Sequence, residues 1–122
     1  MSTLTVYGLA TCDTCRKARK WLESQNLQHR FHDVRKDGLD KEELGRWLRS
    51  PFAGKLLNRQ STTWRQLSNS QKSDAEKNPQ ALLLEYPTLL KRPVFVIGSE
   101  VLAVGFRPNA LAETLKMSAD NR

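Results

Sequence analysis

Two cysteines, Cys12 and Cys15, stand where a β-strand is expected to give way to an α-helix, and this junction constrains the fold more than any other feature. Residues 3–7 alternate in polarity and are rich in β-branched types, which predicts a strand. From Asp13 onward apolar residues recur at helical spacing, and residues 28–34 predict a second strand. The order strand, helix, strand implies a right-handed parallel unit.

The middle of the chain carries helical signals and no strand signal. Asp40 is expected to cap a helix, with Glu43 three residues later as its capping-box partner. Proline fits the first position of a helix, so the Asn78-Pro79 dipeptide predicts another helix start. The short helices expected between residues 51 and 87 are Phe52–Leu57, Thr62–Leu67 with Thr62 as the cap, and Pro79–Tyr86.

The carboxyl-terminal part predicts a hairpin followed by a helix. Two apolar runs, Val94–Ile97 and Glu100–Val104, flank a Gly98-Ser99 loop, which is typical of a two-residue turn with glycine first. Pro108 is expected to open the last helix. A chain of 122 residues is predicted to form one α/β domain, 1–122. Its core is expected at about 3–35 and 88–117, with a helical insertion at about 40–87.

Composition narrows the class of protein. The net charge is +7, but the basic residues are spread along the chain and form no stripe interleaved with aromatics, so no direct nucleic-acid binding is expected. No run of about 20 apolar residues is present, so no membrane association is expected. Two cysteines are too few for a disulfide scaffold, and no export signal is visible, which predicts a cytoplasmic protein. In that compartment a close cysteine pair indicates redox or metal chemistry.

The position of Cys12 favours redox chemistry. Unpaired backbone N–H groups and the helix dipole at a helix start stabilise a thiolate, and Arg16 is expected to add a cation. Cys15 lies on the same helix face, which suits a nucleophile and a resolving thiol. A pair of inert buried thiols is one alternative. Zinc held with His29 and His32 is another, but a strand would point these histidines to opposite faces, and we expect no metal.

Several further segments carry a family likeness, and they run in order from about residue 3 to residue 116. They are Val6-Tyr7-Gly8, Thr11-Cys12, Arg16-Lys17-Ala18, Trp21-Leu22, Asp33-Val34-Arg35, Leu56-Leu57-Asn58, Thr63-Trp64-Arg65-Gln66-Leu67, Leu89-Leu90-Lys91-Arg92-Pro93 and Val104-Gly105-Phe106-Arg107-Pro108. Together they resemble the arsenate reductase (ArsC) / Spx family. The segments Phe31-His32-Asp33 and Asp37-Gly38-Leu39 most resemble the YffB branch of this family.

The resemblance implies a thioredoxin-like fold with a helical insertion between the second and third strands. In such folds a cis-proline precedes the third strand and lies against the active-site cysteine, a position that Pro93 would take. Cys12 matches the family's nucleophile, and Arg92 and Arg107 match two of its three arginines. The third arginine is displaced, because Arg59 falls between the two positions that the branches of the family use.

The function expected from these features is a glutathione-dependent thiol reductase of the ArsC type. The predicted catalytic residues are Cys12, Cys15, Arg92 and Arg107, and the predicted substrate-binding residues are Thr11, Arg16, Arg59, Lys91 and Pro93. Glutathione is expected as co-substrate, with no bound cofactor and glutaredoxin as a possible protein partner. The alternatives are an arsenate reductase and an Spx-like redox-sensing regulator that binds RNA polymerase.

Overall fold

The structure, a computed structural model, describes residues 3–120 and the side chains of residues 3–115. The chain divides into two compact units. The first comprises the described residues up to Asp33 and from Arg92 onward, and the second is Val34–Lys91. The division falls close to the boundaries expected for the helical insertion. That the whole chain is one domain stays a prediction.

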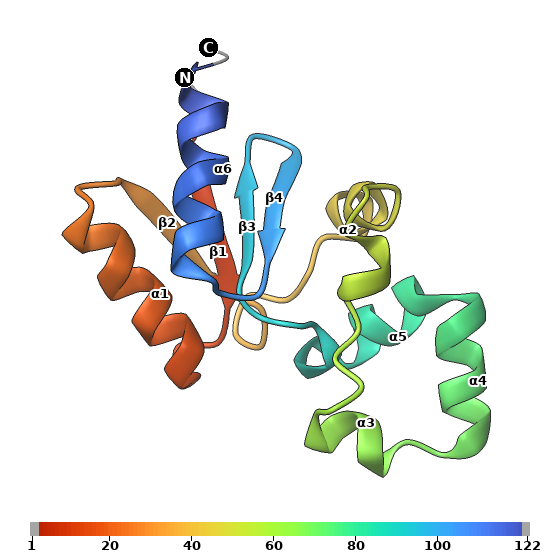
Figure 1. Ribbon diagram of the computed structural model, residues 1–122. Helices are drawn as coiled ribbons and strands as arrows, with labels where there is room; N and C mark the ends of the chain where they lie inside the picture. Colours follow the sequence, from red (N-terminus) through yellow and green to blue (C-terminus); the bar gives the residue numbers. More distant parts are fainter. Residues whose placement is uncertain (1–2, 121–122) are drawn as a thin grey trace. The chain divides into compact units, whose positions relative to one another are not determined.

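The first unit is built on a four-stranded sheet (Figure 1). Its strands are β1 (Leu4–Gly8), β2 (His29–Asp33), β3 (Val94–Ile97) and β4 (Glu100–Val104), in the spatial order β2-β1-β3-β4. β1 and β2 are parallel, whereas β3 is antiparallel to both β1 and β4. With the helices α1 (Asp13–Ser24) and α6 (Pro108–Asp120), these strands form a thioredoxin-like fold, as predicted.

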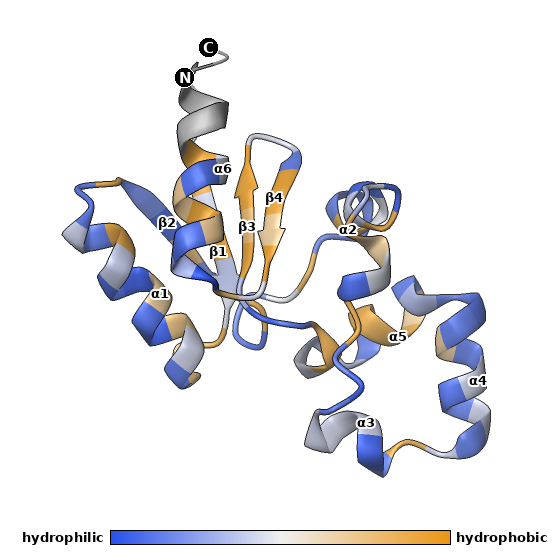
Figure 2. Ribbon diagram, in the orientation of Figure 1, coloured by the Kyte–Doolittle hydropathy of each residue, from blue (hydrophilic) through white to orange (hydrophobic). Residues whose placement is uncertain are grey.

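One face of this sheet forms the hydrophobic core of the first unit. Ala18 and Leu22 of α1 and Leu111 of α6 pack against Val6 and Phe95 of the sheet. The spacing of Ala18 and Leu22 places both on one side of α1, which is why this helix buries a single stripe. In Figure 2 the strands β3 and β4 are mostly hydrophobic, whereas β2 at the edge is mostly hydrophilic.

The hairpin between β3 and β4 forms as predicted. Ile97 pairs with Glu100, and Gly98 has a φ of +61°, the left-handed conformation that glycine adopts without strain. Gly105, with a φ of +84°, ends β4, and its N–H donates to the carbonyl of Pro93 at 2.8 Å. No helix among the described residues is long and apolar enough to cross a membrane.

The second unit is helical. Its elements are α2 (Lys41–Leu48), η1 (Ala53–Lys55), α3 (Thr62–Gln66), α4 (Asn69–Lys77), α5 (Pro79–Glu85) and η2 (Pro87–Leu89). The cap predicted at Asp40 and the helix start predicted at Asn78-Pro79 are confirmed; the Asn78 side chain also accepts a backbone N–H of α5. Three details were wrong. The cap of α3 is Ser61 rather than Thr62, α4 was not expected, and only a three-residue 3-10 turn forms within 52–57.

Candidate active site

Cys12 occupies the N-cap position of α1, directly after the loop that follows β1. Its backbone is extended, with φ −80° and ψ 125°, and its N–H donates to the carbonyl of Leu9 at 3.1 Å. Its carbonyl accepts the first intrahelical hydrogen bond, from Arg16 N–H at 3.0 Å. The Cys12 sulfur therefore lies at the positive end of the helix dipole, beside N–H groups that lack helical partners.

Opposing effects act on the ionisation of Cys12. Burial of the sulfur raises its pKa, but the backbone N–H and the thiol of Cys15 and the guanidinium of Arg92 together lower the pKa below its ordinary value of 9.0. The uncharged thiol makes no capping hydrogen bond. A thiolate accepts hydrogen bonds more strongly than a thiol, so these donors favour the ionised form. Cys12 is also partly exposed, which allows a substrate to reach it.

Cys15 lies in a different environment only one helical turn away. Its side chain is fully buried, and a Cβ placed on Gly8 would overlap its sulfur. Burial and the neighbouring Cys12 raise the pKa of Cys15 to about 11, in spite of a hydrogen bond with the backbone of Leu9 that acts in the other direction. Cys12 is thus the more exposed thiol of the pair, and the environments of the two thiols push their pKa values apart.

Arg92 and Pro93 come to the site from the start of β3. β3 runs antiparallel to β1, and the pairing of Tyr7 with Val94 brings the beginning of β3 to the end of β1. Pro93 is buried, and the Arg92–Pro93 peptide bond is cis, as expected for this fold. Arg92 is half-buried, and its guanidinium interacts with the Cys12 sulfur both as a hydrogen-bond donor and as a charge.

Two of the predicted arginines lie on the exposed surface of the first unit. Arg107 is exposed, and its carbonyl begins α6 by accepting the Leu111 N–H at 2.9 Å. Arg16 forms an ion pair with Asp13 on the exposed surface of α1, so its charge is largely compensated there. That Arg16 supplies a cation to Cys12 stays a prediction. Thr11 is exposed, next to Cys12 in the chain.

Arg59 and Lys91 belong to the second unit, and each is engaged within it. The Arg59 guanidinium donates to Glu76 Oε1 through Nε at 3.1 Å and Nη2 at 2.7 Å. It also lies 5.6 Å from the centre of the Trp64 ring. The Lys91 backbone N–H donates to the carbonyl of Leu56 at 2.8 Å, and its side chain is exposed. Substrate binding by these residues stays a prediction.

Two residues that sequence reasoning missed shape the thiol site. Asp33 ends β2, in register with Gly8, and its Oδ2 accepts the Ala10 N–H at 3.0 Å. This bond ties the loop before Cys12 to the neighbouring strand. Gly8 leaves the space that the Cys15 sulfur fills. Both residues could have been found by aligning the ends of the two predicted parallel strands, since residues there meet at one edge of a sheet.

The two histidines take other places in the first unit. His29 Nδ1 is hydrogen-bonded with the carbonyl of Leu27 at 3.0 Å, and the His32 ring lies 4.8 Å from that of Tyr7. Within the part of the chain that the structure describes, no three His, Cys, Asp or Glu side chains gather closely enough to hold a metal ion.

The four-stranded sheet with α1 and α6, and a partly exposed cysteine at the start of α1, places the protein among the thioredoxin-like folds. The family model described as "ArsC family" matches residues 7–114, which is most of the chain. The protein belongs to the ArsC family.

Individual relatives agree with this assignment. An uncharacterized protein of Haemophilus influenzae is 41% identical over 104 residues, which cover 84% of this chain and 90% of the relative. The global transcriptional regulator Spx 1 of Bacillus cereus is 26% identical over 92% of this chain and 86% of its own length. The solved structure of a YFFB protein has a TM-score of 0.84 and 40% identity, covering 93% of this chain and 99% of its own.

A second solved structure is an arsenate reductase (ArsC) related protein from Brucella melitensis. It has a TM-score of 0.70 and 39% identity, and it covers 93% of this chain and 95% of its own. Arsenate reductase-related proteins and Spx regulators thus both occur among the chain's relatives.

Proposed function

We propose that this protein is a glutathione-dependent thiol reductase that uses Cys12 as its nucleophile. The observation that carries the proposal is the lowered pKa of a partly exposed Cys12, held by Cys15 and Arg92 at the start of a helix. A structural cysteine needs no such environment, whereas a nucleophile at neutral pH does, because the thiolate is the reactive form.

The reaction begins when the Cys12 thiolate attacks one sulfur of a disulfide substrate. The substrate S–S bond breaks, its second sulfur leaves as a thiolate that takes a proton from water, and Cys12 is held in a mixed disulfide. A glutathione thiolate then attacks the Cys12 sulfur, so the remaining substrate sulfur leaves as a thiolate and Cys12 is joined to glutathione. A second glutathione thiolate attacks the glutathione sulfur of this disulfide, which frees the Cys12 thiolate and forms glutathione disulfide. The balance is one disulfide and two glutathione molecules giving two thiols and one glutathione disulfide.

The environment of Cys15 favours glutathione over Cys15 as the resolving thiol. With a pKa of about 11, Cys15 is almost entirely protonated at neutral pH and therefore attacks slowly. When Cys12 is in a mixed disulfide, its negative charge is gone, but the burial that raises the Cys15 pKa remains. Arg107 is exposed, and we assign it to the carboxylates of glutathione, which planar guanidinium groups bind bidentately.

The experiment that tests the proposal is turnover of a glutathionylated peptide, with glutathione disulfide measured by coupling to glutathione reductase. We expect turnover that vanishes in Cys12→Ser and persists in Cys15→Ser. We expect Arg107→Gln to raise KM for glutathione while leaving the Cys12 pKa unchanged. No turnover of the peptide by the wild-type protein would contradict the proposal. A parallel reaction with arsenate, glutathione and glutaredoxin tests the arsenate reductase alternative.

A second candidate function is a redox-sensing regulator that binds RNA polymerase. It is supported by the relatives named Spx, which are transcriptional regulators, and by the presence of two cysteines one turn apart. It requires a Cys12–Cys15 disulfide, and the high pKa of Cys15 works against rapid formation of that bond. Capture of purified RNA polymerase by the oxidised but not the reduced protein would favour the regulator over the enzyme.

A further inference from the structure

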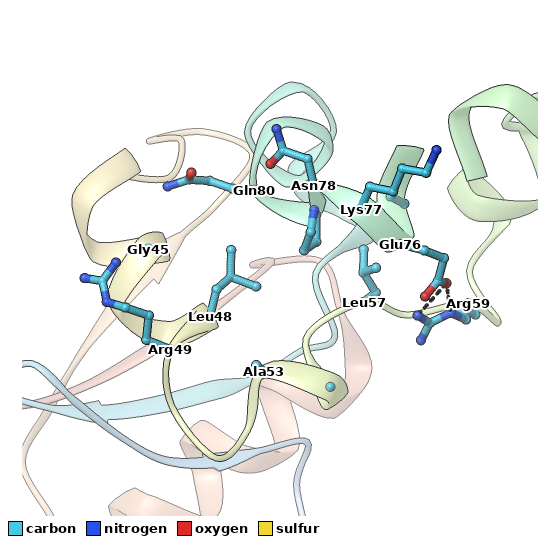
Figure 3. A pocket seen from close by; sticks show the side chains of 13 residues that line it. Gly45, Leu48, Arg49, Ala53, Leu57, Arg59, Glu76, Lys77, Asn78 and Gln80 are labelled. Atoms are coloured by element: carbon cyan, nitrogen blue, oxygen red, sulfur yellow. Dashed lines mark hydrogen bonds and ion pairs between the residues drawn. The ribbon is translucent and has the colours of Figure 1, made fainter. Parts of the chain in front are cut away.

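The second unit contains a cavity that is lined by none of Cys12, Cys15, Arg92 and Arg107. Its volume is about 490 Å³, and every residue that lines it belongs to this unit. It lies between α2, the 3-10 turn η1 and the junction of α4 with α5 (Figure 3). Leu48 and Leu57 point into the space between these elements, and Ala53 and Pro79 add further apolar surface. These side chains therefore offer a surface that can bury the apolar part of a ligand.

Polar groups converge at one end of the cavity, over Gly45. A Cβ built on Gly45 would lie 3.3 Å from Gln80 Nε2 and 3.4 Å from Arg49 Nη1, so both groups use the space that the glycine leaves. Gln80 Nε2 donates to the carbonyl of Lys41 at 2.9 Å, which fixes the orientation of its amide. The Arg49 guanidinium thus stands beside an oriented amide at the edge of an apolar surface.

The charges of the lining are unbalanced. Arg59 is neutralised by Glu76, at 2.7 Å. Arg49 and Lys77 also line the cavity, and no carboxylate among the side chains of residues 3–115 forms an ion pair with either of them. The cavity therefore carries a net positive charge, which complements an anionic ligand.

We propose that this cavity binds a small carboxylic acid with an apolar body. The carboxylate would take a bidentate hydrogen bond from Arg49, beside Gln80, and the hydrocarbon would cover Leu48 and Leu57. The volume lies within the range of about 300–1,000 Å³ typical of small-molecule sites, and a few convergent polar groups over an apolar lining are typical of them as well. The inference goes beyond the proposed reductase function and does not depend on it.

The test is a titration of the full-length protein, labelled with ¹⁵N, with sodium octanoate, followed by NMR. We expect saturable shifts of the amides of Gly45, Leu48, Arg49, Leu57 and Gln80. Octylamine has the same chain with the opposite charge and should give no saturable shift. Acetate has the carboxylate without the chain and should bind far more weakly.

Three variants locate the site. Arg49→Gln removes the cation and should weaken octanoate binding about tenfold, since hydrogen bonds to charged groups are the strong ones. Arg46→Gln makes the same change of charge on the same helix at an exposed residue that does not line the cavity, and it should leave binding unchanged. Gly45→Leu fills the cavity and should abolish binding. Leucine also favours a helix more than glycine does, so this variant is expected to fold.

Three results would overturn the proposal. Equal binding of octanoate and octylamine would show that Arg49 and Lys77 do not select a negatively charged ligand. Octanoate binding that survives in Gly45→Leu, or shifts confined to other residues, would place the ligand elsewhere. Binding of an acidic peptide by the same residues without any binding of octanoate would assign the cavity to a polypeptide instead. Since none of these variants touches Cys12, reductase activity reports separately on the proposed function.

Discussion

Replacing Arg92 with glutamine tests whether this arginine activates Cys12. The substitution removes a charge-assisted hydrogen bond from the Cys12 sulfur and the charge beside it. Hydrogen bonds to charged groups contribute about 1.5–3 kcal/mol, and the partial exposure of Cys12 places this one at the lower end. At 1.36 kcal/mol for each factor of ten, the fraction of thiolate should fall about tenfold at any pH below the Cys12 pKa of both proteins.

The rate of reaction should fall by less than the thiolate fraction. A thiolate with a higher pKa is a better nucleophile, with a Brønsted slope of about 0.4–0.5, so each remaining thiolate of the variant should react about threefold faster. The net expectation is a rate about threefold lower at a pH below both Cys12 pKa values, and about threefold higher at a pH where both proteins are fully ionised. The two pH–rate profiles should therefore cross.

The assay is thiol–disulfide exchange with 4,4′-dithiodipyridine, an uncharged disulfide whose product absorbs, measured across pH. Arg92→Lys should fall between the wild type and Arg92→Gln, because lysine keeps the charge without the planar fork of donors. Lys17→Gln, an exposed change of the same charge on α1, is the matched control and should leave the profile unmoved. Profiles of Arg92→Gln and the wild type that are parallel, or that coincide, would refute the reasoning.

Three further predictions concern the packing around the thiols. Between pH 9 and pH 11 the unfolded chain releases the Cys15 proton, whereas the folded protein retains it. The free energy of unfolding of the wild type should therefore fall over this range by up to about 2.7 kcal/mol more than that of Cys15→Ala. Urea denaturation at the two pH values measures this difference. Gly8→Ala should destabilise the protein by about 1–3 kcal/mol through overlap with the Cys15 sulfur, and most of that cost should disappear in a Cys15→Ala background; equal costs in both backgrounds would contradict the overlap. Asp33→Ala should speed hydrogen exchange of the Ala10 amide about tenfold, whereas Asp33→Asn, which keeps an acceptor oxygen, should change it little; equal effects would mean that the bond is not what protects this amide.

The parts of the fold that could be predicted are those with strong local signals. The Gly98-Ser99 turn and the caps of α2 and α5 depend on residues only a few positions apart. Helix α4 was missed for a physical reason. Of its side chains only Ala75 is buried, so it shows no apolar period, and its main signal is the capping box of Ser68 with Gln71. Ser61 was passed over as a cap because Thr62 is also a good capping residue.

The candidate site could be predicted only in part, because its residues come together through the sheet. The place of Cys12 at a strand–helix junction is local and could be read from the sequence. The contact of Arg92 with Cys12 depends on β3 pairing beside β1, which no local pattern contains. The same holds for Asp33, which reaches Ala10 because β2 and β1 end in register. Arg107 has the same residue type and a neighbouring proline, yet the start of α6 leaves it exposed.

The caps of the helices explain why Cys12 is activated where it stands. In α2, α3, α4 and α5 an oxygen of the N-cap side chain accepts the backbone N–H three residues later; these caps are Asp40, Ser61, Ser68 and Asn78. In α1 the N-cap is Cys12 and the N–H three residues later is that of Cys15. A thiol is a poor acceptor and makes no capping bond, so α1 gains a strong cap only when Cys12 ionises. When Cys12 ionises, its sulfur therefore becomes both the reactive nucleophile and the capping acceptor of α1.

This equivalence predicts how substitutions of Cys12 affect stability. Cys12→Ser supplies a capping oxygen at every pH and should be more stable than Cys12→Ala by about 1 kcal/mol, measured by urea denaturation. The pKa of Cys12 is lower in the folded protein than the 9.0 of an ordinary thiol, so the stability that its thiolate contributes is complete above pH 9 and is lost as the pH falls through the folded pKa. Relative to Cys12→Ser, the wild type should therefore lose stability on acidification. A constant difference between these two proteins at every pH would mean that folding does not lower the pKa of Cys12, and it would refute both the capping thiolate and its stabilisation by Arg92.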